Sequence, residues 1–261
     1  MVPELRASAL VDAPVAVVAG ALLDTSLIAG FGVKVPGPLL CLGDVLTGPF
    51  GVKLTVTRAD LSGVSAAGDF LELHTDLVVT GAGTMVIDRV AWTTVGGVVG
   101  RFADVTVGRG MALRVLQKRS ALLAERCREL SGARVVVGAA IVRGGRLLAQ
   151  QRSYPESHAG QWELPGGRVE DGEKPEEALV RECVEELGVS VVVGEQVGPD
   201  VPLRKDVVLR IFAAELAELD GDEPEALEHN AVRWLTADEL PATDWLPADR
   251  VLVPALQELL N

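Results

Sequence analysis

Aromatic residues are scarce in this chain: 4% of its 261 residues are Phe, Trp or Tyr, and only one is Tyr. Because 48% of the residues are nevertheless hydrophobic, the core must be built mainly from Val, Leu and Ala. Positive charge is also in short supply, since 24 Lys and Arg face 37 Asp and Glu and the net charge is −13. This balance excludes the basic surface that binds nucleic-acid polymers. A protein so acidic binds a polyphosphate when a divalent cation lies between the negative charges.

Cysteine and long apolar runs are rare as well. The three cysteines have neither metal-binding nor disulfide spacing, and their odd number suits a reducing compartment. The apolar segment Ala13–Leu23 is too short to span a bilayer, and Glu4 and Asp12 before it are atypical of a signal peptide. The sequence therefore predicts a cytoplasmic protein without a membrane partner.

The pattern of the chain predicts two domains, residues 1–131 and 132–261. Met111–Leu130, at the end of the first, has apolar residues at helical spacing with basic residues between them. The second begins with Arg134–Val142, a β-branched run, and Arg146–Gln151 then reads as the returning strand of a hairpin with a Gly-Gly turn.

The first domain is expected to have an α+β fold. Glu4–Val11 is predicted to be a strand, and Asp12 is placed to cap a helix that has Pro14 in its first turn and runs to about Leu23. Further strands are expected at Leu39–Leu46, Val52–Arg58, Gly63–Ala67, Phe70–Val79 and Thr84–Thr94.

This order of strand, helix, meander and long closing helix resembles the START-like, or polyketide-cyclase-like (SRPBCC), helix-grip family. Gly100–Arg126 resembles the start of the closing helix in that family. The resemblance implies an apolar ligand in the first domain, and the alternative is a structural or homodimerising role. We find no catalytic cluster there, because His74 and Asp88 are isolated in the sequence.

The segment with the clearest chemistry is Gly167–Val189, which reads GRVEDGEKPEEALVRECVEELGV. On a helix, Glu182, Glu185 and Glu186 stand at i, i+3 and i+4 and share one face. Like charges so placed repel, and a site that keeps them is usually neutralised by cations. Oxygen ligands favour Mg²⁺ or Mn²⁺ over zinc. The alternative is an ordinary solvated acidic helix face.

The same segment resembles the Nudix box, G-x(5)-E-x(7)-R-E-U-x-E-E-x-G-U. All fixed positions match, namely Gly167, Glu173, Arg181, Glu182, Glu185, Glu186 and Gly188. A chance match of this length is expected about once in 10⁸ start positions. Cys183 departs slightly from the usual aliphatic residue but buries in a similar way. The resemblance implies a Nudix hydrolase with an α/β/α sandwich and a mixed sheet, in which Glu173 and Arg181 orient the carboxylates.

The flanks of the box resemble the MutT-like branch of the Nudix family. The segment Gly160–Glu173, GQWELPGGRVEDGE, is similar to the residues that lead into the box in that branch. There the glycine before the box offers its carbonyl to the metal, which implies that role for Gly166. The arginine that ends the second strand contacts phosphate, which implies that role for Arg152; otherwise Arg152 is a surface residue at a strand end.

A later segment, Glu225–Leu240, resembles the loop and strand that deliver another acidic residue to the site. By register with Trp234 that residue is Glu228, as a further metal ligand or as the base that activates water. Glu225 is a nearby alternative. We interpret His229 as a residue that orders the loop rather than as a base.

The last segment, Asp244–Leu256, resembles the end of MutT-like and CTP-pyrophosphohydrolase-like enzymes, where the residue after Pro-Ala contacts the base. That residue is Asp249, whose carboxylate suits the exocyclic amine of cytosine and also an N–H edge of oxidised guanine. The alternative is that Asp249 caps a final helix at Arg250–Leu260. The resemblance also implies that Glu163 and Arg210 line the base pocket.

These resemblances imply a Mg²⁺-dependent reaction in which water attacks the β-phosphorus of a nucleoside triphosphate, releasing the monophosphate and pyrophosphate, with Glu186 or Glu228 as base. Two alternatives remain open. One is a Nudix hydrolase that acts on ADP-ribose or a dinucleoside polyphosphate. The other is a nucleotide-sensing module with a relic box, which would be marked by lost box glutamates.

Overall fold

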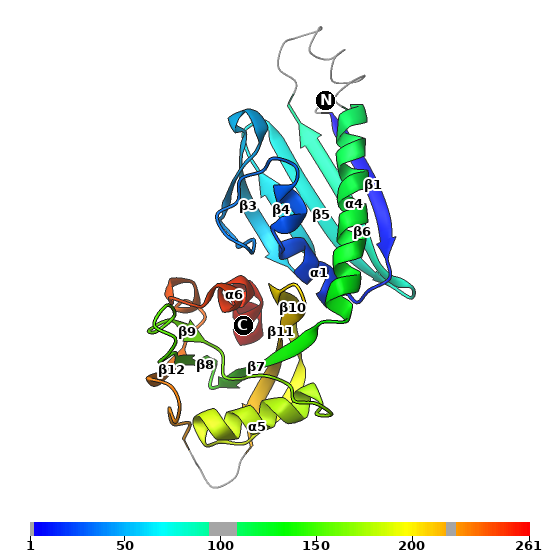
Figure 1. Ribbon diagram of the computed structural model, residues 1–261. Coiled ribbons are helices and arrows are strands. Elements are labelled where there is room, and N and C mark those ends of the chain that lie inside the picture. The colour runs from blue at the N-terminus through cyan, green and yellow to red at the C-terminus, as the bar shows by residue number, and fades with distance from the viewer. Residues whose placement is uncertain (1–2, 94–108, 218–222) are drawn as a thin grey trace. The chain divides into compact units, whose positions relative to one another are not determined.

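The structure is a computed structural model that describes residues 3–93, 109–217 and 223–261 (Figure 1). It contains two compact units, Met1–Gly132 and Ala133–Asn261. Within the described ranges, no helix is long and apolar enough to cross a bilayer.

The first unit is built on an antiparallel sheet with strand order β1-β6-β5-β4-β3-β2. Its strands are β1 (Glu4–Val11), β2 (Val45–Thr47), β3 (Lys53–Asp60), β4 (Gly63–Ala67), β5 (Leu71–Thr80) and β6 (Gly83–Trp92). Alternate residues of the long strands are buried, as expected for a sheet with one covered face.

Helices cover this sheet. They are α1 (Val15–Leu23), α2 (Ser26–Ala29) and α4 (Arg109–Ser131), and the short 3₁₀ helix η1 is Pro49–Gly51. Helix α1 packs against α4 and against β4, β5 and β6, while α4 also contacts β1 (Figure 1). This is the order of elements that the sequence predicts; membership of the START-like family, with its apolar ligand, stays a prediction.

Two elements of the first unit differ from the prediction. Only the end of Leu39–Leu46 is a strand, because Asp44 Oδ2 accepts a 2.8 Å hydrogen bond from Cys41 N and Gly43 has a φ of +86°, which together form a turn. Asp12 does not cap α1, since the N-cap residue is Pro14. Residues 94–108, which include Thr94 and the beginning of Gly100–Arg126, lie outside the described ranges.

A further difference is that Asp88 is not isolated in the structure. Its Oδ1 accepts 2.7 Å hydrogen bonds from Thr75 Oγ1 and from Arg119 Nη1 on α4. Strand neighbours and the closing helix therefore satisfy a buried carboxylate that the sequence pattern left without a partner. His74 lies within 3.1 Å of Ser65 Oγ through its Nδ1.

The second unit has the mixed sheet that the sequence predicts. Its strand order is β10-β11-β7-β8-β12, and β9 pairs with β8. The strands are β7 (Arg134–Arg143), β8 (Arg146–Gln151), β9 (Trp162–Glu163), β10 (Val191–Arg204), β11 (Val207–Leu216) and β12 (Ala231–Leu235). Strands β11 and β7 are parallel and the other pairs are antiparallel. The predicted fold class is thus confirmed.

Two helices lie on opposite sides of these strands (Figure 1). Helix α5 (Pro175–Leu187) packs on β7 and β10, and α6 (Pro247–Leu260) packs on β10 and β8; η3 is Leu240–Ala242. The core between α5 and the sheet consists of small and aliphatic side chains with few aromatics, as the composition requires.

Candidate active site

A cavity of about 480 Å³ opens in the second unit. Most of the residues that the sequence singles out line it, from β9, α5, α6 and the neighbouring loops: Arg152, Glu163, Gly166, Gly167, Glu182, Glu186, Glu228 and Asp249. Segments up to a hundred residues apart in the chain therefore meet at one place.

Local signals in α5 position the acidic side chains. Pro175 begins the helix, the Glu177 carboxylate accepts a 3.1 Å hydrogen bond from Lys174 N, and Gly188 ends the helix at a φ of 71°. Such residues are typical start and stop signals of a helix. They fix the helix so that Glu182 and Glu186, one turn apart, both line the cavity.

Arg181 is the centre of an ion-pair network on this helix. Its guanidinium donates to both Glu173 oxygens at 3.1 Å, to Glu182 Oε1 at 2.9 Å and to Glu185 Oε2 at 3.2 Å. The hydrogen bonds from Arg181 lower the pKa of Glu173. This geometry suits the orienting role that the resemblance implies for Glu173 and Arg181. Glu185, half exposed and held by Arg181, does not line the cavity.

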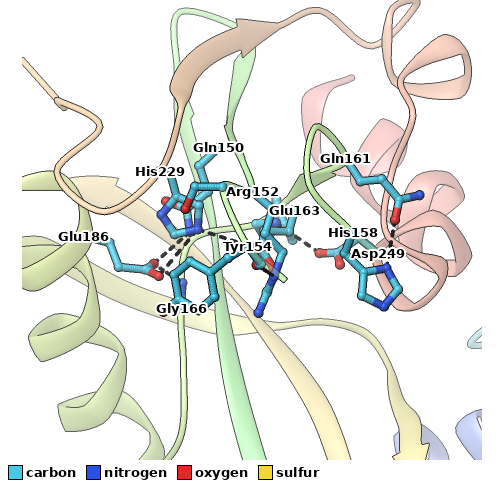
Figure 2. A network of polar contacts seen from close by, with 12 residues as sticks. Gln150, Arg152, Tyr154, His158, Gln161, Glu163, Gly166, Glu186, His229 and Asp249 are labelled. Atoms are coloured by element: carbon cyan, nitrogen blue, oxygen red, sulfur yellow. Dashed lines mark hydrogen bonds and ion pairs between the residues drawn. The ribbon is translucent and has the colours of Figure 1, made fainter. Parts of the chain in front are cut away.

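Glu186 is one of the buried carboxylates of the site (Figure 2). Its Oε2 accepts hydrogen bonds from Gln150 Nε2 at 2.8 Å and from Gly166 N at 2.9 Å, and its Oε1 lies 3.8 Å from His229 Nε2. Burial raises the pKa of Glu186, while the hydrogen bonds from Gln150 and Gly166 and the charge of His229 oppose the rise.

The two glycines before α5 lie close to their neighbours, with backbone beside Gly166 and a side chain beside Gly167. A Cβ on Gly166, whose φ is +148°, would lie 2.1 Å from Val137 O. A Cβ on Gly167 would lie 2.3 Å from Glu182 Cδ. The Gly-Gly pair thus lets the loop approach both the central strand and the carboxylate of Glu182.

Arg152, Glu163 and His229 form a second polar group in the cavity wall (Figure 2). Arg152 Nη1 pairs with Glu163 Oε2, and His229 Nε2 is 3.0 Å from Glu163 Oε1. The His229 side chain is only 9% exposed, so it contributes to the site itself as well as to its loop. Arg152 remains one-third exposed at the cavity, where its fixed charge suits a phosphate.

Asp249 lies to the right of Glu163 in Figure 2, whereas Glu186 and His229 lie to its left. Its Oδ1 accepts a 3.0 Å hydrogen bond from Leu164 N, and the residue is 5% exposed. Burial raises the pKa of Asp249 to about 7, although the hydrogen bond from Leu164 N opposes this. The alternative that Asp249 caps the final helix is wrong: α6 begins at Pro247, and Asp249 is already inside its first turn.

Arg210 is not brought to the cavity. It extends from β11 to the buried Asp200, with 2.8 and 2.6 Å hydrogen bonds, and this pairing raises its pKa. The expectation that Arg210 lines the base pocket is corrected, because its guanidinium is held by the buried Asp200 of β10 and Arg210 does not line the cavity. Glu228 lines the cavity with an exposed side chain, whereas Glu225 does not line it.

Sequence reasoning missed Gln150, Arg168 and Tyr154, all of which contact or line the site. Gln150 had a signal: it is a polar residue within the apolar run of β8, where its neighbours are fully buried. Arg168 and the single Tyr154 lie on exposed loop segments, and their sequence context gave no such sign.

The NUDIX domain family matches residues 132–256. Putative 8-oxo-dGTP diphosphatase 2 of Mycobacterium tuberculosis is 46% identical over 130 residues, which cover 49% of this chain and 90% of the relative. The chain belongs to the Nudix family. Its second unit is a Nudix hydrolase domain, and the family resemblance of the box is confirmed.

Two other proteins are similar to about half of the chain. CTP pyrophosphohydrolase of Escherichia coli is 36% identical over 124 residues, covering 48% of this chain and 91% of the relative. The solution structure of the E. coli ORF135 protein has 35% identity and a TM-score of 0.43, and covers 50% of this chain and 94% of that one.

Nudix hydrolases generally use a divalent metal ion. In residues 3–93, 109–217 and 223–261, no three His, Cys, Asp or Glu side chains already converge on one metal position. The donor chemistry nevertheless fits such an ion. Glu182 and Glu186 bring two largely buried carboxylates to the cavity, and Arg181 compensates only the first of them directly. Hard carboxylate oxygens suit a hard divalent cation.

Proposed function

We propose that the Nudix unit hydrolyses a nucleoside triphosphate to the monophosphate and pyrophosphate, with Mg²⁺ as the divalent ion. The observation that carries this proposal is the cavity in which Glu182 and Glu186 of the box face Arg152 and Asp249. Acidic groups for a cation, a fixed positive charge for phosphate and a buried carboxyl group for a base thus line one space.

The names of the relatives support a nucleotide substrate. The M. tuberculosis relative and one E. coli relative are named 8-oxo-dGTP diphosphatase, and another E. coli relative is named CTP pyrophosphohydrolase. We propose a cytidine or oxidised guanine nucleotide, and Asp249 favours cytidine because an ionised carboxylate accepts from the exocyclic amine.

We assign the following roles in this reaction to residues of the chain. Glu182 and Glu186 hold the cation, together with Glu228 and the Gly166 carbonyl, and Glu185 joins them if it leaves Arg181. Arg152 binds the phosphates. When bound, Mg²⁺ supplies positive charge that stabilises the phosphoryl oxygens.

Proton transfer completes the proposed reaction. The attacking water gives its proton to Glu186 or to Glu228, and its oxygen forms a bond to the β-phosphorus. The bond between the β-phosphorus and the oxygen that joins it to the α-phosphorus breaks, so that the monophosphate leaves with that oxygen and pyrophosphate remains. Burial raises the pKa of Glu186, which makes it a stronger proton acceptor than a solvated glutamate once it is ionised.

The Glu186→Gln variant tests this assignment. We expect kcat for the best nucleoside triphosphate to fall about 100-fold or more, because the amide neither accepts the proton nor offers a negative charge. Pyrophosphate release with Mg²⁺ measures the effect. Glu195→Gln, at an exposed carboxylate of β10, is the matched control and should keep normal turnover. Unchanged turnover in Glu186→Gln would contradict the role assigned to Glu186.

A further inference from the structure

Gln150 has an unusual position for an amide side chain. It lies in β8 with no exposed surface, and its neighbours Leu148 and Ala149 are equally buried. Its Nε2 donates to Glu186 Oε2 at 2.8 Å, while its Oε1 is buried and accepts no hydrogen bond from the part of the chain that the structure describes. A buried acceptor without a partner destabilises the folded state.

The orientation of this amide is fixed by chemistry. An ionised carboxylate only accepts hydrogen bonds, so the NH₂ group of Gln150 must face Glu186 and the carbonyl must point away from it. Exchanging the two atoms would place two acceptors side by side. The hydrogen bond to Glu186 and the unpartnered, buried Oε1 therefore both follow from this single orientation of the amide.

The hydrogen bonds to Glu186 are distributed unevenly between its oxygens. Gln150 Nε2 and Gly166 N both donate to Oε2, at 2.8 and 2.9 Å. Oε1 lies 3.8 Å from His229 Nε2, beyond hydrogen-bond distance. Two donors, one from the strand and one from the loop, thus hold Oε2, and the carboxylate that they hold belongs to a residue that lines the cavity.

We propose that Gln150 is a positioning residue that fixes the Glu186 carboxylate with Oε1 directed at the bound divalent cation. The inference rests on the proposed function, since it concerns the metal site of that reaction. Outer partners of metal ligands typically change metal affinity or activity about 10- to 100-fold when they are removed.

A positioning role and a structural role predict opposite effects on stability. Gln150→Met keeps the length and nearly the volume of the side chain but removes both polar atoms. It deletes the contact with Glu186 and also the unpartnered buried carbonyl. We therefore expect weaker Mn²⁺ binding and lower kcat, with a melting temperature that is unchanged or higher and a nearly unchanged KM for the nucleotide.

The matched control is Gln151→Met, at the next residue of the same strand. Gln151 Nε2 donates to Gly160 O and does not contact Glu186. Mn²⁺ affinity, measured by calorimetry on the full chain without nucleotide, should fall about 10-fold or more in Gln150→Met and stay unchanged in Gln151→Met. Equal affinity in Gln150→Met and the natural protein, or a loss accompanied by a lower melting temperature, overturns the proposal.

Two further measurements keep the test decisive. If Gln150→Met does not fold, Gln150→Asn keeps an amide that is one methylene too short, and we expect the same loss of Mn²⁺ affinity. In a Glu186→Gln background, Gln150→Met should cause no additional loss, because its effect passes through Glu186; an additive loss overturns the proposal. If Mn²⁺ binding depends on Gln150 but no nucleotide is hydrolysed, only the proposed function fails.

Discussion

At the scale of single residues, the burial of Asp249 has a measurable consequence. The folded protein raises the pKa of Asp249 to about 7, from a model-peptide value of 3.8, mainly because the carboxyl group is removed from water. A raised carboxyl pKa means that folding favours the protonated form. Stability from this group is full below pH 3.8 and is lost as the pH rises toward 7.

The Asp249→Asn variant tests this linkage. Asn is neutral at every pH and keeps an oxygen for the hydrogen bond from Leu164 N. We expect the two proteins to differ little near pH 4, and the natural protein to be less stable than the variant at pH 8, by up to about 4 kcal/mol. Urea unfolding followed by tryptophan fluorescence measures the difference. A constant difference across this pH range would show that Asp249 is ionised throughout.

The placement of some side chains could be predicted from the sequence, and that of others could not. The box defines the spacing of Glu182 and Glu186, and a helix fixes their shared face. Arg210 could not be placed, because its direction depends on which residue of β10 it faces, and that residue is Asp200. The contact of His229 with Glu163 also joins loops that are distant in sequence.

At the scale of elements, α5 depends on its end signals. Gly188 ends the helix with a φ of 71°, a left-handed conformation that costs an L side chain energy. A Cβ there would meet only Leu227 Cδ1, at an ordinary 3.6 Å. The backbone conformation, not space, is therefore what requires glycine.

Gly188→Ala should lower the free energy of unfolding by about 1 kcal/mol, because alanine adopts the left-handed conformation poorly. Chemical denaturation measures this loss. Gly188→Asn is the matched comparison and should lose less, since asparagine tolerates this conformation. Equal stability of the alanine variant and the natural protein would show that the end of the helix relaxes without cost.

Strands with clear turn signals were predicted with correct bounds, as β4 and β8 show. The error at Leu39–Leu46 has a local cause. Its apolar residues read as a strand, but the side chain of Asp44 competes for the backbone of Cys41 and makes a turn. Side-chain hydrogen bonds of this kind override a run of apolar residues.

At the scale of the whole molecule, the chain divides into Met1–Gly132 and Ala133–Asn261, and every residue that lines the candidate site belongs to the second unit. Each unit has its own sheet and buried core. The first unit has a fold layout that the sequence predicted, while its START-like identity, apolar ligand and any homodimer stay predictions.

We expect a fragment of residues 133–261 to fold and to hydrolyse the same nucleotides with the kcat/KM of the full chain, because the described residues that line the site all belong to the second unit. Steady-state kinetics on both proteins measure this. A folded but inactive fragment would mean that the first unit contributes to catalysis.

The central claim is that this Nudix unit splits nucleoside triphosphates at the β-phosphorus. The most direct measurement is product identification by phosphorus NMR after incubating the full chain and Mg²⁺ with CTP, dCTP, oxidised dGTP or ADP-ribose. The account predicts a nucleoside monophosphate and pyrophosphate from at least one triphosphate. Release of a nucleoside diphosphate and orthophosphate, or hydrolysis of ADP-ribose alone, would contradict it.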